Sequence, residues 1–324
     1  MSAEFQAIDL EIPEEVAGLR LDRALARLLP EHSRTRIRAW IDAGDVEAGG
    51  RRLKPSDIVD AGTKVRVRVV APPAQTAVLA EAIGLTLVHQ DRDCLVVDKP
   101  AGLVVHPGAG NPRHTLQNAL LGFDPALAAV PRAGIVHRLD KDTSGLLVVA
   151  RTLEAHTSLT RQLAARQVAR EYRTVCSGLP TGGGTIDVPI GRHRGDRSRM
   201  AVREDGRPAV THYRVLERFR AHALCAVRLE TGRTHQIRLH FAHARHPIVG
   251  DPVYGGRLKR PRGASDELVA ALREFKRQAL HAASLSFDHP RSGRRNRFES
   301  PLPGDFQNLL SALREDARIA LAAS

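Results

Sequence analysis

The chain has 324 residues, which suffices for one large domain or two smaller ones. Its 49 basic and 36 acidic residues give a formal net charge of +13, which favours polyanionic partners such as nucleic acids but also serves solubility. Three cysteines without a CxxC motif argue against a disulfide scaffold or a structural zinc site. Because no apolar run reaches membrane-spanning length and the acidic N-terminus does not resemble a secretion signal, we expect a cytoplasmic protein.

The N-terminal part is predicted to contain two helices and a strand. Residues 1–17 read as a poorly packed tail. Leucines at helical spacing predict a helix over 21–28, and Ser33 is a plausible N-cap for a second helix over 34–43. Valines alternate with cations over 64–69, which predicts a strand with one apolar and one basic face.

A change in composition at residues 71–76, APPAQT, indicates a linker between two domains. Beyond it, short apolar segments and helical segments follow at irregular spacing, which favours an α+β fold over a doubly wound sheet. The helices are expected over 153–166 and 267–275, and an amphipathic terminal helix over 305–323. The expected strands are 85–88, 94–97, 103–105, 146–150, 172–176, 211–216 and 223–229.

The most informative segment is HRLDKDTSG, residues 137–145. It is a polar connection between two apolar segments, 135–136 and 146–150, and such loops often carry reactive groups. A solvated turn capped by its Asp and Ser residues explains the composition equally well. Spacing alone does not decide between Asp140 and Asp142.

This segment resembles the signature of the RluA family of pseudouridine synthases. Further family-like blocks follow in family order, so the resemblance runs from about Gly18 to Pro303. They are DKPAGLVVHPGAGNPRHTLQNALL, REYRTVCSG, LETGRTHQIRLHFAHARHPIVGDPVYGG and RQALHAASLSFDHP. The resemblance implies the pseudouridine synthase fold, a mostly antiparallel mixed sheet with flanking helices and a cleft across its face.

The resemblance also assigns roles to residues. Asp140 matches the catalytic aspartate, which acts near C1′ of the ribose as a nucleophile or by stabilising charge. Arg238 matches its cationic partner, and Tyr172 matches a tyrosine that stacks on the base and is a candidate for removing the C5 proton. Without the family motifs, Arg238 would read as a surface charge and Tyr172 as ordinary core. Further substrate contacts are expected from Arg138, Thr143, Arg233, Gln236 and Leu280, the last as an apolar floor under the uracil.

GLRLDRALARLLPEHSRTRIRAWIDAGDV is similar to the opening of S4 RNA-binding domains. Where those domains often read Val-Asn-Gly, this chain has VEAGG at 46–50, which still allows a tight hairpin turn. A solvated basic face is the alternative reading of the cations around this region. The residues expected to contact RNA are Arg34, Arg36, Arg38, Arg66, Arg68, Arg192, Arg194, Arg197 and Arg199.

These observations divide the chain into five parts. They are a tail (1–17), an S4-like domain (18–71), a linker (72–82), a catalytic domain (83–304) and a C-terminal helical tail (305–324).

No metal or cofactor is expected. His235, His240, His243 and His246 lie close together in sequence, but there is no HExxH motif and no carboxylate between His235 and Asp251. The glycines of PGAGN, residues 107–111, lack the remainder of a phosphate-binding loop.

A uridine within a structured RNA must be flipped out before its glycosidic bond can be reached. The resemblance points to large-subunit ribosomal RNA as the partner, at uridines in the loop of helix 69, and we expect a monomeric enzyme. Other ribosomal or transfer RNA sites, and a non-catalytic S4-type RNA-binding or ribosome-assembly protein, remain as alternatives. Formation of pseudouridine by the purified protein distinguishes the last of these.

Overall fold

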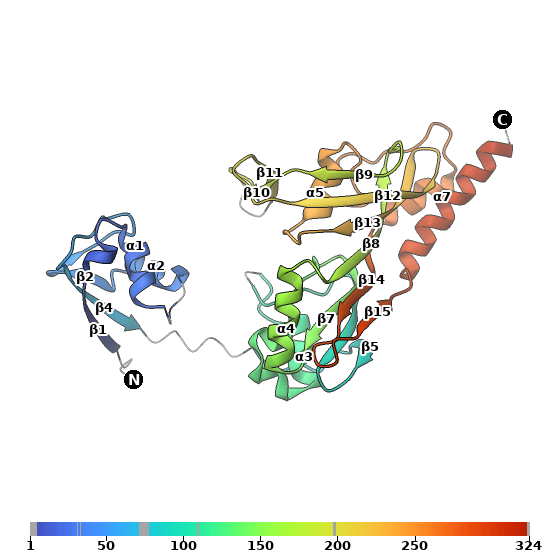
Figure 1. Ribbon diagram of the computed structural model, residues 1–324. Coiled ribbons are helices and arrows are strands. Elements are labelled where there is room, and N and C mark those ends of the chain that lie inside the picture. Colours follow the sequence, from blue (N-terminus) through green and yellow to red (C-terminus); the bar gives the residue numbers. More distant parts are fainter. Residues whose placement is uncertain are drawn as a thin grey trace. The chain divides into compact units, whose positions relative to one another are not determined.

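The computed structural model describes residues 5–30, 32, 34–70, 78–108, 110–196 and 199–322. The chain divides into two compact units between Ala77 and Val78 (Figure 1). The expected linker at 71–76 and the expected N-cap Ser33 lie outside the described residues. None of the described helices is both long and apolar enough to cross a lipid bilayer.

The first unit is a four-stranded antiparallel sheet, in the order β1-β4-β2-β3, with two helices. Its elements are β1 (Phe5–Glu11), a 3₁₀ turn (Glu14–Val16), α1 (Leu21–Leu28), α2 (Arg34–Ala43), β2 (Val46–Ala48), β3 (Arg51–Arg52) and β4 (Lys64–Val70). Both predicted helices and the predicted strand are present. Val65 and Val67 are buried, whereas Arg66 and Arg68 are exposed, as the alternation in this strand predicts.

Gly49 and Gly50 make the predicted turn between β2 and β3. Both have positive φ angles, 56° and 78°, which a two-residue primed hairpin turn requires. The Gly-Gly sequence therefore replaces the usual motif without disturbing the hairpin.

The prediction of a poorly packed N-terminal tail is wrong for residues 5–17. Strand β1 pairs along the whole of β4, with Ile8 opposite Val67, and Ile12 and Val16 are buried in the core of the first unit. The alternation of Ile8, Leu10 and Ile12 is the signal of this strand. The acidic residues between them conceal it, because they face outward from an edge strand.

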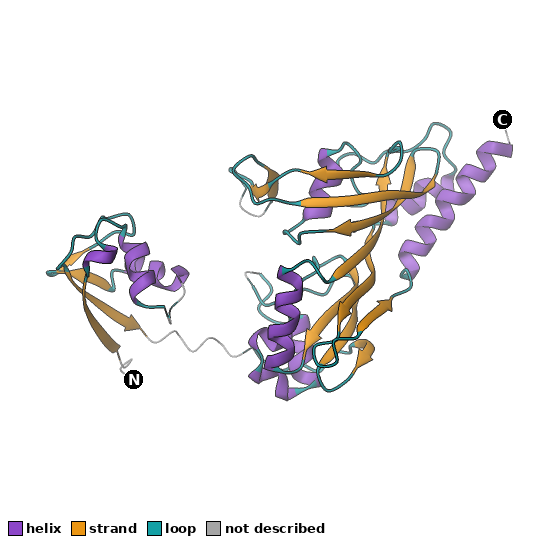
Figure 2. Ribbon diagram, in the orientation of Figure 1, coloured by secondary structure: helices purple, strands orange, loops and turns teal. Residues whose placement is uncertain are grey.

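The second unit is built on a nine-stranded sheet (Figure 2). Its order is β5-β6-β7-β14-β8-β13-β12-β9, with β15 paired to β14. All pairings are antiparallel except β7 with β14, so the expected mostly antiparallel α+β fold is confirmed. The strands are β5 (Thr86–Gln90), β6 (Cys94–Lys99), β7 (Ser144–Ala150), β8 (Ala169–Ser177), β9 (Gly184–Asp187), β12 (Val210–Arg218), β13 (His222–Leu229), β14 (Leu280–Asp288) and β15 (Arg295–Glu299). A separate hairpin joins β10 (Ile190–Arg192) and β11 (Met200–Val202).

Helices flank this sheet (Figure 2). They are α3 (Leu116–Phe123), α4 (Leu153–Ala164), α5 (Gln236–His243), α6 (Asp266–Glu274) and α7 (Gly304–Ala322), with 3₁₀ turns at Pro125–Ala129 and Pro131–Gly134. The predicted strand at 103–105 is absent, because Val104 makes only a single bridge to Thr115. The other strands expected beyond the linker are present, with shifted ends.

The predicted catalytic domain, residues 83–304, is too short at both ends. At its start, the Asn118 side chain donates a hydrogen bond to the carbonyl of Leu79, so residues 78–82 belong to the second unit rather than to a linker. At its end, Phe306 and Leu309 of α7 are buried in the main core, so this helix is a structural part of the domain rather than a tail.

The parallel pairing of β7 with β14 places the polar loop 137–143 beside the start of β14. Gly145 stands opposite Ala282 with a φ of 110°, and a Cβ on it would lie 2.3 Å from the Ala282 carbonyl oxygen. Glycine is therefore required where the two strands meet. This junction fixes the loop against the centre of the sheet.

Candidate active site

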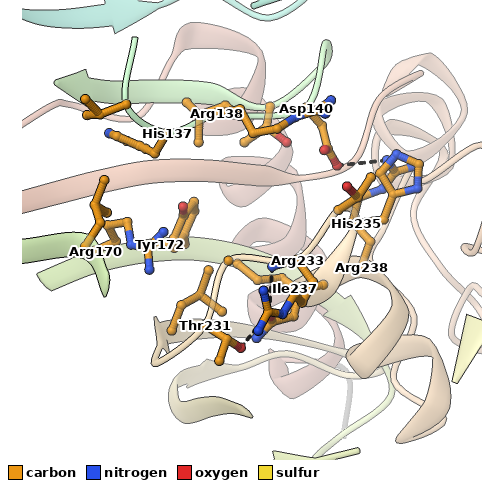
Figure 3. Close-up of a pocket in the computed structure, with 18 of the residues that line it drawn as sticks. His137, Arg138, Asp140, Arg170, Tyr172, Thr231, Arg233, His235, Ile237 and Arg238 are labelled. Carbon is orange, nitrogen blue, oxygen red and sulfur yellow. Dashed lines mark hydrogen bonds and ion pairs between the residues drawn. The ribbon is translucent and has the colours of Figure 1, made fainter. Parts of the chain in front are cut away.

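A cleft of about 820 Å³ lies in the second unit. Its walls come from the loop 135–143, from β8 and from the segment 229–238 that leads into α5 (Figure 3). Asp140, Tyr172 and Arg238 all line it, so the fold brings together three residues far apart in sequence.

Arg238 connects two aspartates. Its Nη1 donates to Oδ2 of Asp140 at 3.0 Å, while Nε and Nη2 donate to the two carboxylate oxygens of Asp251 at 2.7 and 2.9 Å. The expected pairing of Arg238 with Asp140 is thus present in the geometry. Asp251 was not predicted, although it lies in the family-like block that ends in GDPVYGG.

Asp251 is a buried anchor rather than a cleft residue. Its side chain is fully buried and also accepts hydrogen bonds from the backbone N–H groups of Val253 and Tyr254. Burial alone would raise the pKa of Asp251, but the hydrogen bonds and charge of Arg238 outweigh it, so the pKa is lowered. Burial alone would lower the pKa of Arg238, but the hydrogen bonds and charges of Asp251 and Asp140 outweigh it, so the pKa is raised. Arg238 is therefore held as a cation with one N–H directed at Asp140.

Lys99, at the end of β6, helps to hold the loop 137–143 in place. Its side chain is buried, and its Nζ donates to the carbonyl oxygens of Pro100, Leu103 and Lys141 at 2.7, 2.9 and 2.9 Å. Burial lowers its pKa to about 7, against the opposing charges of Asp142 and Asp140. The sequence did not single out this lysine, since its contact with the loop is made to the carbonyl of Lys141, 42 residues away.

Two residues preceding β14 hold the other end of this loop. Arg277 donates to the carbonyl of Asp142 at 3.2 Å, and Gln278 donates to the Thr143 hydroxyl at 3.0 Å. Thr143 is 2% exposed and lines the cleft, and its hydroxyl accepts this hydrogen bond, so it helps to position the loop. Together with Lys99 and Arg238, these contacts leave Asp140 little freedom.

Tyr172 in β8 and Leu280 in β14 lie on the same face of the sheet, and both line the cleft. Tyr172 is 5% exposed and Leu280 is 4% exposed. Burial raises the pKa of the Tyr172 hydroxyl, so this group stays protonated at neutral pH. Both side chains present apolar surface to the cleft.

The remaining predicted substrate residues have different surroundings. Arg138 and Arg233 line the cleft, Arg138 as an exposed side chain. Gln236 is buried, and its amide bonds Thr231, Arg233, Val210 and Thr211. Because every polar position of this amide is occupied, Gln236 supports the cleft wall that it lines.

Four of the nine arginines expected to contact RNA form ion pairs within the first unit. Arg34, Arg38, Arg66 and Arg68 pair with Asp22, Asp42, Asp9 and Glu47, and all four arginine side chains are more than half exposed. Ion pairs of exposed arginines are weak, so phosphates can compete for these cations. In the second unit, Arg194 is exposed, while Arg199 donates to the carbonyl of Val253. Arg192 ends β10, and Arg197 and the side chain of Arg36 lie outside the described residues.

The four neighbouring histidines do not converge on a common point. His235 contacts the hydroxyl of Tyr254, while His240 and His246 contact the carbonyls of Val188 and Ser177. Among the described residues, two other groups that could hold a metal share Asp91; they are His89-Asp91-Cys94 and Asp91-Asp93-His289. Hydrogen bonds within the protein already occupy the Asp91 carboxylate, both of whose oxygens have donors.

Comparison with known proteins shows the family of the chain. Residues 93–243 match the model of the RNA pseudouridylate synthase family, and residues 19–65 match the S4 domain. A protein of Xanthomonas campestris named ribosomal large subunit pseudouridine synthase D is 59% identical over 94% of this chain and 92% of its own length. The chain belongs to the RNA pseudouridine synthases. Relatives of the same name from Pseudomonas aeruginosa and Haemophilus influenzae are 58% and 49% identical, over 94% and 95% of this chain and 95% of their own lengths.

Solved structures of two human relatives have the fold of this synthase. Human RNA pseudouridylate synthase domain containing 1 matches with a TM-score of 0.53 and 28% identity, over 69% of this chain and 86% of that one. Human RNA pseudouridylate synthase domain containing 4 matches with a TM-score of 0.55 and 26% identity, over 71% and 93%. The synthase fold and the enzyme class expected from the sequence are both confirmed.

Proposed function

We propose that this synthase converts uridines to pseudouridine in large-subunit ribosomal RNA, in the loop of helix 69, with Asp140 acting at C1′. The observation that carries the proposal is the Asp140 carboxylate, held by Arg238 at 3.0 Å in a cleft that also contains Tyr172. The names of the bacterial relatives and the S4 match support the ribosomal substrate.

The reaction is an isomerisation that needs no redox agent. The N1–C1′ bond breaks, the uracil turns within the cleft, C5 bonds to C1′, and the proton lost from C5 is balanced by one gained at N1. A carboxylate beside C1′ serves as nucleophile or stabilises the positive charge that develops on the ribose. Arg238 donates a hydrogen bond to this carboxylate and fixes its direction.

Tyr172 and Leu280 provide the surface on which the uracil turns. Because the Tyr172 hydroxyl remains protonated, stacking is the role its environment supports, rather than removal of the C5 proton. Stacking tolerates rotation of a base in its own plane, since it needs no fixed hydrogen bonds. This tolerance suits a step in which the base detaches and turns.

The volume and charge of the cleft fit a flipped nucleotide. A volume of about 820 Å³ lies within the range of small-ligand sites, roughly 300–1,000 Å³. Arg132 and Arg138, both exposed, line it and can reach phosphates on either side of the extruded nucleotide. The first unit adds further phosphate contacts through the exposed cations of α2 and β4.

Two measurements test the substrate. The purified protein is expected to form pseudouridine in a transcript of the helix 69 stem-loop, and a matched transcript with cytidine at the target positions is the control. Mapping pseudouridines in ribosomal RNA from a strain lacking the gene should show losses in helix 69. Unchanged helix 69 and losses at other ribosomal or transfer RNA positions would reassign the target.

A further inference from the structure

His235 has an unusual backbone conformation in the cleft. It precedes α5 with φ 56° and ψ 21°, a left-handed conformation that is uncommon for residues other than glycine and is adopted most often by asparagine, aspartate and histidine among the rest. Its side chain does not cap the helix. The conformation instead directs the imidazole into the cleft, beside Asp140 (Figure 3).

Contacts with Tyr254 fix the orientation of the His235 ring. Nδ1 lies 3.0 Å from the Tyr254 hydroxyl, and the two rings meet edge to face with centroids 5.7 Å apart. The Tyr254 oxygen in turn accepts the backbone N–H of Met200 at 2.9 Å. The guanidinium groups of Arg199 and Arg238 lie 5.6 and 5.3 Å from the centre of the tyrosine ring.

The same contacts decide which ring nitrogen of His235 is left for substrate. Nδ1 lies 3.0 Å from the Tyr254 hydroxyl, which also donates to the Met200 carbonyl at 3.3 Å. Burial lowers the pKa of His235 despite the nearby charge of Asp140, which favours the neutral imidazole. Nε2 is the ring nitrogen available to substrate, since it has no hydrogen-bond partner within the described part of the chain.

We propose that His235 is a substrate-binding residue whose Nε2 forms a hydrogen bond with the 2′-hydroxyl of the target nucleotide. This inference rests on the proposed position of C1′ at Asp140, because the 2′-hydroxyl is attached to the neighbouring ribose carbon. A phosphate oxygen in this place would bring a second negative charge against Asp140, whereas a hydroxyl is neutral. The contact distinguishes RNA from DNA at the nucleotide that reacts.

The test compares two substitutions on two substrates. Asparagine tolerates the left-handed backbone but is too short to replace Nε2, whereas the amide of glutamine reaches about that position. Single-turnover rates are measured for the full-length wild type, His235→Asn and His235→Gln on helix 69 stem-loops with uridine or 2′-deoxyuridine at the target. His243→Asn is the matched control, since His243 is exposed on the same helix and does not line the cleft.

With the uridine substrate, we expect His235→Asn to be about tenfold slower than wild type, and His235→Gln to recover most of that loss. With 2′-deoxyuridine, His235→Asn and wild type should react at the same rate, because the interaction is already missing. Equal losses on both substrates would overturn the assignment while leaving the proposed function intact. A wild type that forms no pseudouridine in the uridine stem-loop would overturn both.

Discussion

Asp251 holds the guanidinium of Arg238 from the side opposite Asp140, through two hydrogen bonds of 2.7 and 2.9 Å. Nη1 of Arg238 donates to Asp140. A bidentate pair restricts rotation of the guanidinium plane, so the position of the cation beside Asp140 is set by a residue that does not line the cleft. Orientation of the Asp140 carboxylate thus depends on a buried carboxylate that substrate does not reach.

Asp251→Asn should therefore impair both folding and chemistry. Leaving part of a buried ion pair without its partner is expected to reduce the free energy of unfolding by roughly 3 kcal/mol. Looser positioning of Arg238 should slow the single-turnover rate by about 10²-fold at a temperature where the variant is folded. Urea denaturation and rapid-quench assays measure the two effects. Asp205→Asn, which removes an exposed partner of Arg203, is the control and should change neither.

Lys99→Met should reveal the cost of burying an ammonium group. The pKa of Lys99 is about 7 in the folded protein and about 10.5 in the unfolded chain, so between these values the unfolded state binds more protons. The free energy of unfolding of the wild type should then rise with pH relative to the variant, by up to roughly 1.4 kcal/mol per pH unit. Below about pH 7 the difference should be constant. Stability curves of the two proteins that run parallel from pH 7 to 10 would contradict the assignment.

Tyr172 variants separate stacking from proton transfer. Tyr172→Phe keeps the ring and removes the hydroxyl, so we expect single-turnover rates within about threefold of wild type. Tyr172→Ala removes the stacking surface, and a loss of about 10–100-fold is expected from the size of base–aromatic stacking. A large loss in Tyr172→Phe, on the scale of 10²–10⁴-fold, would instead show that the hydroxyl takes part in proton transfer.

Removing the first unit should weaken RNA capture more than chemistry. The main core of the second unit consists only of residues from 78 onward, so residues 78–324 are expected to fold alone. The truncated protein should retain its saturated single-turnover rate, bind RNA more weakly, and show a shallower dependence of affinity on salt because fewer phosphates are neutralised. An unchanged salt slope would show that residues 1–77 do not bind this RNA.

The sequence indicated the candidate catalytic residue better than the residues that support it. HRLDKDTSG is a contiguous signature, so its resemblance to the family was sufficient to nominate Asp140. Asp251 and Lys99 act through hydrogen bonds to groups 13 and 42 residues away, and no local pattern reveals such pairs. For Gln236, the sequence indicated the site but not the role of the side chain. Its motif indicates a functional site, but only the structure reveals that its amide is fully engaged within the cleft wall.

The fold shows the same contrast between features that depend on local sequence and features that depend on distant residues. The alternation of valines and arginines over 64–69 was sufficient to predict β4, because it is a property of a single strand. The parallel pairing of β7 with β14 joins residues 137 positions apart, so periodicity in either strand could not indicate it. That pairing places the loop 137–143, and it was not predicted from the sequence.

The central claim is that Asp140 performs the chemistry and does not hold the RNA or the fold. Asp140→Asn preserves the size of the side chain and an acceptor for Arg238, whose position Asp251 still fixes. The direct test measures single-turnover pseudouridine formation and RNA affinity on one preparation of this variant, with the helix 69 stem-loop as substrate. We predict a rate at least about 10³-fold below wild type with affinity within about twofold. A variant that still turns over within tenfold of wild type, or that loses RNA binding and turnover in parallel, would contradict the account.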